Sequence, residues 1–224
     1  MHASPDQRIA AIASGQHGAV TRDQLHAAGL CDSSIALRVR NGRLHRVHRG
    51  VYLVGHRAMS RTTRWMAAVL AGGEGTYLDL HDAAELHDIA RPSWRYRRRR
   101  SVAVISKRQH RPARGIRFQR TRHLPPTHVT TIDGIPVVTI ARLLVDLASC
   151  ETPTTICKLI DEAAYHDRLD LPVVRSVAEE FRTGRAGYAI VMDGIALYDD
   201  GERGTDSELE EEGLRFTESC GVPS

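Results

Sequence analysis

Apolar residues recur at helical spacing in three short segments at the start of the chain. The spacing predicts helices over residues 6–14, 21–30 and 31–42, each bounded by glycine. Thr21 and Asp32 precede the second and third apolar patterns and are predicted N-caps. The positions predicted to face inward are Ile9, Ile12, Ala13, Leu25, Ala28, Ile35, Ala36 and Val39.

The pattern then changes to that of a β-hairpin. In the stretch "GRLHRVHRGVYLVG" the run from Val51 to Val54 consists of β-forming residues, and Arg49-Gly50 is a plausible tight turn. Three helices and a hairpin within about 55 residues are the plan of a winged helix-turn-helix, whose third helix enters a major groove. We therefore expect such a domain over residues 1–56.

The remaining sequence predicts two further parts. Residues 57–150 alternate helical patterns with strand-like runs such as "SVAVIS" and "GIRFQRT", and Asp133-Gly134 is a two-residue hairpin turn. Residues 151–224 have mainly helical patterns. The predicted fold class is α+β: an N-terminal winged helix-turn-helix, then a mixed α/β domain and an acidic helical C-terminal tail.

Charge divides the chain in the same places. Residues 1–56 have seven arginines and three acids, and residues 57–150 have seventeen basic and seven acidic residues. Residues 151–224 reverse the balance, with seven basic and seventeen acidic residues. A basic front and an acidic tail are typical of nucleic-acid binding. No apolar run is long enough to span a membrane and no signal peptide is evident, so we expect a cytoplasmic protein without membrane contact.

The third helix and the hairpin together predict a DNA-contacting surface. Five arginines and no acid occur between Ser33 and Val54. If Ile35 and Val39 are buried, the polar side chains of the third helix face outward, where they could meet base edges and phosphates. The predicted DNA-binding residues are Ser33, Ser34, Arg38, Asn41, Arg43, Arg46, His48 and Arg49. The alternative is a small helical domain with a solvated basic face.

A second basic segment, "RPSWRYRRRR", interleaves Trp94 and Tyr96 with arginines. This composition could hold phosphates while stacking bases, and a solvated loop is the alternative. The arginines of this second predicted surface are Arg95, Arg97, Arg98, Arg99 and Arg100.

No fingerprint of a cofactor, metal site or catalytic nucleophile is present. The four cysteines include no C-x-x-C pair, which favours reduced, mostly structural thiols. We expect no cofactor, no bound metal and no catalytic residue.

Several longer stretches resemble a known family. Four stretches carry the resemblance: "RVHRGVYLVGH", "RTTRWMAAVLAGGEG", "HDAAELHDI" and "IDGIPVVTIARLLVDLAS". In their order and amino-acid sequence they resemble the AbiEi-type antitoxins of type IV toxin–antitoxin systems, over about residues 5–150. The resemblance implies a transcriptional regulator that binds repeats in its own promoter, represses its operon and acts as an antitoxin through the following domain. It also implies a cognate toxin encoded nearby, with no direct contact required. The sequence leaves open whether the protein binds as a homodimer.

The C-terminal stretch "GTDSELEEEGLRF" is similar to the opening of a nuclease domain in longer relatives, of the type found in very-short-patch-repair endonucleases. The resemblance implies that Glu208 or Glu210 of this sequence corresponds to the helix carboxylate of a PD-(D/E)xK site. The Asp and the E-x-K strand of such a site are missing here. One alternative function is therefore a truncated, inactive endonuclease relative whose front half binds DNA. A protein-interaction module without nucleic acid is another.

Overall fold

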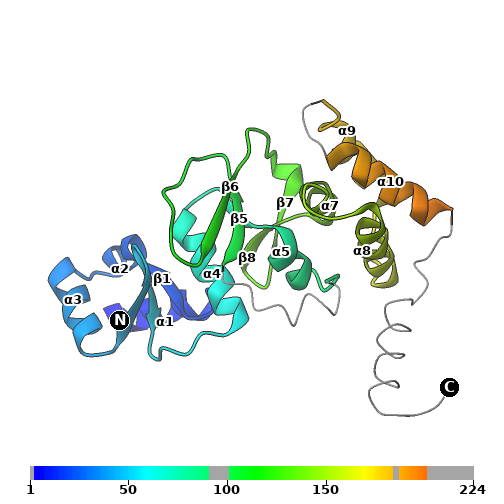
Figure 1. Cartoon of the computed structure of the whole chain (residues 1–224). Helices are drawn as coiled ribbons and strands as arrows, with labels where there is room; N and C mark the ends of the chain where they lie inside the picture. Colours follow the sequence, from blue (N-terminus) through cyan, green and yellow to red (C-terminus); the bar gives the residue numbers. More distant parts are fainter. Residues whose placement is uncertain (1–2, 91–100, 184–186, 201–224) are drawn as a thin grey trace, which may run out of the picture. The chain divides into compact units, whose positions relative to one another are not determined.

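The computed structural model describes residues 3–90, 101–183 and 187–200, and the chain divides into two compact units, residues 1–143 and 144–224. Figure 1 labels their helices and strands. The α+β class predicted from the sequence is confirmed. None of the helices within the described ranges is both long and apolar enough to cross a membrane.

The first unit begins with three helices and a small antiparallel sheet, which we call the N-terminal module (residues 5–54). Strand β3 is central in the sheet order β1-β3-β2. The module's elements are α1 (Pro5–Ser14), β1 (Ala19–Thr21), α2 (Arg22–Ala27), α3 (Asp32–Arg40), β2 (Leu44–His48) and β3 (Val51–Val54).

Local capping chemistry sets the helix starts in this module. Ser4 and Thr21 each form a capping box, with Gln7 and Gln24 respectively, so the predicted Thr21 cap is confirmed. The predicted Asp32 cap is wrong, because Cys31 occupies the N-cap position of α3. The Asp32 carboxylate instead accepts two hydrogen bonds from the Arg22 guanidinium.

The three helices and the sheet enclose one apolar core. Its buried members are Ile9, Ala13, Val20, Leu25, Ala28, Leu30, Ile35, Leu44 and Tyr52. Removal of their apolar surface from water stabilises the module and fixes which face of each helix is exposed.

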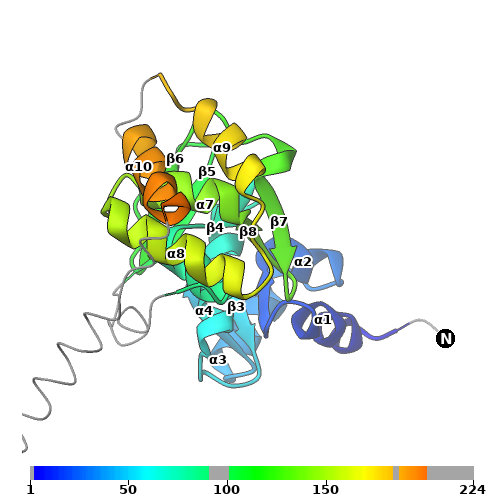
Figure 2. The same ribbon diagram turned by 90° about the vertical axis from the view of Figure 1, so that its right-hand side faces the viewer.

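The second part of the first unit is built on a five-stranded mixed sheet of order β6-β5-β4-β8-β7. Helix α4 packs against β4, β5 and β8, and also contacts the N-terminal module (Figure 2). The elements are α4 (Arg61–Gly72), β4 (Thr76–Leu78), α5 (Leu80–Leu86), β5 (Val102–Ser106), β6 (Ile116–Arg120), η1 (Pro126–His128), β7 (Val129–Ile132) and β8 (Ile135–Val138). Helix α7 (Ile140–Leu147) follows and spans the boundary between the two units.

A buried carboxylate joins three of these elements. Asp82 of α5 accepts hydrogen bonds from Trp65 Nε1 of α4, at 2.9 Å, and from the Ala103 amide of β5, at 3.0 Å. Both donors are buried, so the loss of Asp82 would leave two polar groups without this acceptor. The carboxylate thus helps to hold α4 and α5 against the sheet.

The β7–β8 hairpin reaches the N-terminal module. Its turn is the predicted Asp133-Gly134 pair, and both residues have positive φ, as a two-residue type I′ turn requires. His17 Nε2 lies 2.7 Å from the Asp133 carbonyl oxygen, and Thr63 of α4 donates to the His17 carbonyl. These contacts link the module to the mixed sheet within the first unit.

The second unit is helical, as predicted for its sequence. It contains α8 (Pro153–Tyr165), α9 (Leu171–Glu179) and α10 (Gly187–Asp199). A Cβ atom on Gly194 of α10 would lie 2.7 Å from Ile156 of α8, so glycine permits the close approach of these helices. An ion pair between Arg175 and Asp199 joins α9 to α10. The predicted helix at "SELEEEGLRF" lies outside the described residues.

Candidate nucleic-acid interface

Helix α3 presents a continuous exposed stripe to solvent. Ile35 is buried at 4% exposure and anchors the inner face of the helix. Ser33, Ala36, Leu37 and Arg40, spaced i, i+3, i+4 and i+7, are exposed. At 100° per residue this stripe is centred about 150° from Ile35. The predictions that Ala36 and Val39 face inward are wrong, since Ala36 is exposed and Val39 is 37% exposed.

Arg38 is placed differently from the other predicted residues of α3. Its guanidinium lies 2.6 Å from Asp6 Oδ1 of α1, and its side chain is only 21% exposed. The hydrogen bond from Arg38 lowers the pKa of Asp6 below its usual value. Arg38 is therefore already engaged by a carboxylate on the first helix.

The other predicted residues of α3 divide by exposure. Ser33 and Asn41 are exposed, whereas Ser34 is half-buried and its hydroxyl lies 3.2 Å from Cys31 Sγ. Arg40 was not predicted as a site residue, yet it is exposed and has no carboxylate partner in the part of the chain that the structure describes. Its position one turn after Ala36 and Leu37 could be derived only after the buried side of α3 was known.

The β2–β3 hairpin supplies the second group of cations. Arg43, Arg46 and Arg49 are exposed, and none forms an ion pair with a carboxylate among the described residues, although the charge of Arg43 contributes to the lowered pKa of Asp6. The charges of these arginines are thus available to a polyanion in solution.

His48 contributes less charge than its position suggests. It is half-buried, and burial lowers the pKa of its imidazole, so that the neutral form is favoured at neutral pH. The strand also has a β-bulge between Arg46 and His48. The bulge interrupts the strict alternation by which residues two apart on a strand, such as Arg46 and His48, would share a face.

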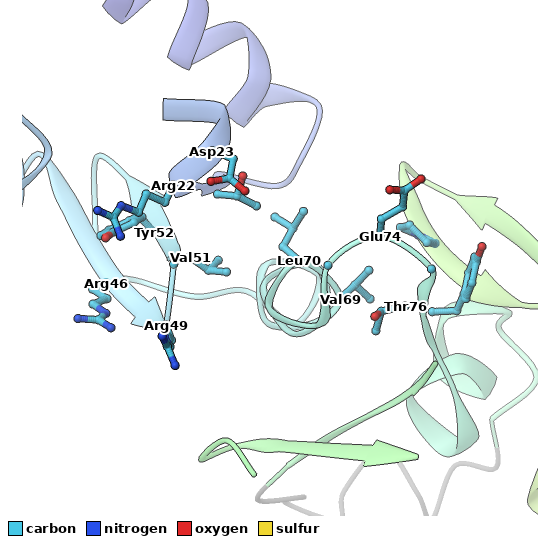
Figure 3. A pocket seen from close by; sticks show the side chains of 16 residues that line it. Arg22, Asp23, Arg46, Arg49, Val51, Tyr52, Val69, Leu70, Glu74 and Thr76 are labelled. Atoms are coloured by element: carbon cyan, nitrogen blue, oxygen red, sulfur yellow. The ribbon is translucent and has the colours of Figure 1, made fainter. Parts of the chain in front are cut away.

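A cleft of about 750 Å³ begins beside the hairpin. Figure 3 shows Arg46 and Arg49 on the hairpin side, and Glu74 and Thr76 on the opposite side beyond the end of α4. Arg22 also lines the cleft, but Asp32 holds its guanidinium. Among these three arginines of the cleft, only Arg46 and Arg49 lack a carboxylate partner within the described ranges.

Cys31 lies exposed at the start of α3. Its Sγ lies 3.0 Å from Ser33 Oγ, and hydrogen bonds from Ser33 and Ser34 lower the thiol pKa to about 6. Cys150 is also exposed, whereas Cys157 is buried, and none of the three forms a disulfide, as expected of reduced thiols. The environment of Cys31 favours the thiolate.

The second predicted basic surface, with Arg95 and Arg97–Arg100, lies outside the described residues.

Comparison with known proteins identifies the class of the N-terminal module. Residues 7–55 match the sequence model of a family described as "Transcriptional regulator, AbiEi antitoxin". The predicted resemblance to AbiEi-type antitoxins is confirmed for this segment, which contains α3 and the hairpin arginines. It supports a role in transcriptional regulation and as an antitoxin.

The structure is also similar to a solved protein, RV2827C from Mycobacterium tuberculosis. The TM-score is 0.54 at 15% sequence identity, over 85% of this chain and 77% of that chain. At this identity the similarity concerns the fold alone. No curated protein sequence matches the chain.

Proposed function

We propose that this protein is a DNA-binding transcriptional regulator and the antitoxin of a type IV toxin–antitoxin system, and that it represses its own operon. One observation carries the proposal. Within the segment that matches the AbiEi regulator family, α3 and the β2–β3 hairpin carry four exposed arginines that form no ion pair with a carboxylate among the described residues. They are Arg40, Arg43, Arg46 and Arg49.

In this proposal the N-terminal module is a winged helix-turn-helix. Helix α3 enters the major groove of operator repeats in the promoter, and the β2–β3 hairpin is the wing that contacts phosphates. Neutralisation of phosphates by Arg43, Arg46 and Arg49 releases counterions and supplies most of the non-specific affinity. The side chains of α3 then select the sequence.

We propose that the three parts predicted from the sequence have separate roles. Residues 1–56 bind DNA, residues 57–150 provide antitoxin activity and residues 151–224 form an acidic tail. The toxin is encoded nearby and need not touch the antitoxin. The protein acts in the cytoplasm without catalysing a reaction, and a homodimer would match repeated operator sites by symmetry.

A promoter-binding experiment tests this function. Purified protein is titrated onto duplex DNA from upstream of its own gene and onto unrelated duplex DNA, and a reporter behind the same promoter is measured in cells. We expect preferential binding to the promoter and a repressed reporter, both weakened in an Arg46→Ala, Arg49→Ala variant. The control is Arg175→Ala, Arg182→Ala, which removes two cations that already face carboxylates in the second unit. A promoter bound no better than unrelated DNA would contradict the regulatory role.

The antitoxin role is tested separately in cells. The adjacent reading frame is expressed alone and together with this protein, and growth is measured. We expect growth arrest by the neighbour alone and rescue on co-expression. A neighbour that leaves growth unaffected, or arrest that this protein does not relieve, would contradict the antitoxin role while leaving promoter binding intact.

A further inference from the structure

The exposed stripe of α3 is unusual in its chemistry. Two of its four members are apolar: Ala36 and Leu37, which is 45% exposed. We call Ala36 and Leu37 the apolar strip. Ile35 alone among the residues of α3 lies in the module's core cluster. The other apolar side chains of α3 lie outside this cluster and leave part of their surface in water, where a bound partner could cover it.

The surroundings of this apolar strip indicate what the partner is. Arg40 continues the stripe, Arg43 follows directly after the helix, and Arg46 and Arg49 project from the hairpin. No acidic residue occurs between Ser33 and Val54. An apolar strip accompanied by arginines without ion-pair partners is complementary to a surface that carries methyl groups between rows of phosphates. The major groove of DNA presents such a surface, because thymine places its 5-methyl group there.

A second copy of this chain is a poorer occupant. A symmetric contact between two α3 helices would place this surface against an identical surface, and both copies would bring Arg40 and Arg43 to the contact. The acid nearest to the stripe, Asp32 at the start of α3, is already held by Arg22 and His26. The charges thus favour a polyanion over self-association through this face.

We propose that Ala36 and Leu37 are specificity-determining residues that recognise thymine methyl groups in the operator, and that Arg40 is the arginine of α3 directed at the DNA. This inference rests on the proposed DNA-binding function. It assigns the selection of DNA sequence to Ala36 and Leu37, which the sequence analysis did not predict as DNA-binding residues. Arg38 is excluded from this role by its ion pair with Asp6.

Thymine-to-deoxyuridine replacement gives a direct test, since it removes only the methyl group. The full chain first selects its preferred site from a random duplex library. Each thymine of that site is then replaced in turn, and affinity is measured for the wild type and for Leu37→Ala. We expect replacement of at least one contacted thymine to weaken wild-type binding by roughly fourfold, as for one methylene-sized group removed from water.

The Leu37→Ala variant should bind the thymine and deoxyuridine versions of the site equally at that position. Leu37 is exposed, so the variant should fold, and circular dichroism verifies this. Val173→Ala is the matched control, because Val173 is equally exposed at 45% on α9 of the second unit. This control should keep the full fourfold discrimination.

The outcomes separate this inference from the proposed function. Duplex binding that is indifferent to every methyl group would overturn the inference and leave DNA binding intact. A dimer that dissociates on Leu37→Ala, with unchanged methyl discrimination, would also overturn it and assign the strip to self-association. Failure to bind any duplex would refute the proposed function together with this inference.

Discussion

Arg38 of α3 and Asp6 of α1 form an ion pair, with 2.6 Å between Nη2 and Oδ1. The burial of Ile35 sets the inner face of α3, and the pair holds the Arg38 side chain toward α1, whereas Ala36, Leu37 and Arg40 are exposed. The consequence is that the arginine which the sequence places on the DNA surface supports the helix instead.

This pair predicts a modest, pH-dependent coupling in stability. Asp6 is largely exposed, so a double-mutant cycle of Asp6→Ala and Arg38→Ala should give about 0.2–1 kcal/mol at neutral pH. Because the folded-state pKa of Asp6 is lowered, the stabilisation is present above the unfolded carboxyl pKa of about 3.9 and is lost as pH falls through the folded value. Urea denaturation between about pH 5 and pH 3 measures it.

Comparison of Arg38→Ala with a further variant, Arg40→Ala, tests the orientation of α3. Arg40→Ala should weaken DNA binding more than Arg38→Ala does, since only Arg40 has an uncompensated charge among these two residues. A loss of sequence discrimination in Arg38→Ala with no effect of Arg40→Ala would show that α3 faces the other way in solution.

Local signals in the sequence predicted much of the fold. Thr21 before α2 and the Asp133-Gly134 turn each use side-chain or backbone chemistry within a few residues, so a sequence pattern can identify them. Their predicted roles agree with the structure.

The orientation of α3 depended on contacts that sequence spacing does not contain. Once Ile35 is buried, either Val39 or Arg38 could lie next to it on the covered side of α3. Arg38 lies there because its guanidinium donates a hydrogen bond to Asp6, 32 residues away in the sequence. Strand β1 was missed for the same reason: it is three residues long and exists through pairing with β3. The exposure of the hairpin arginines was predictable, because the apolar strand residues and the position of the turn indicate which side chains of a hairpin are buried.

Gly134 should reveal the contact between the β7–β8 turn and the N-terminal module. Its φ is 76°, and an added Cβ would lie 3.0 Å from the Gly15 carbonyl oxygen. Gly134→Ala should therefore destabilise the protein by more than the roughly 1–2 kcal/mol of left-handed backbone strain alone. Gly55→Ala is the control, because Gly55 also has positive φ but nothing within 4 Å of the added atom. Equal losses of unfolding free energy in the two variants would mean that the turn does not contact the module in solution.

Cys31 should react faster than an ordinary cysteine at neutral pH. Hydrogen bonds from Ser33 and Ser34 place its pKa at about 6, so the thiolate predominates above that pH. Alkylation by iodoacetamide, located by peptide mass spectrometry, should show a pH midpoint near that value. The Ser33→Ala, Ser34→Ala variant should shift the midpoint upward, whereas buried Cys157 should stay protected in both proteins. A Cys31 midpoint unaffected by the two substitutions would contradict this assignment.

The salt dependence of duplex binding tests the central claim most directly. If Arg40, Arg43, Arg46 and Arg49 each contact one phosphate, log K against log salt concentration should have a slope of about −3.6. The Arg46→Ala, Arg49→Ala variant should flatten that slope by about 1.8, and the Arg175→Ala, Arg182→Ala control should leave it unchanged. Absence of binding, binding indifferent to salt, or an unaltered slope in the hairpin variant would contradict a DNA interface built on α3 and the β2–β3 hairpin.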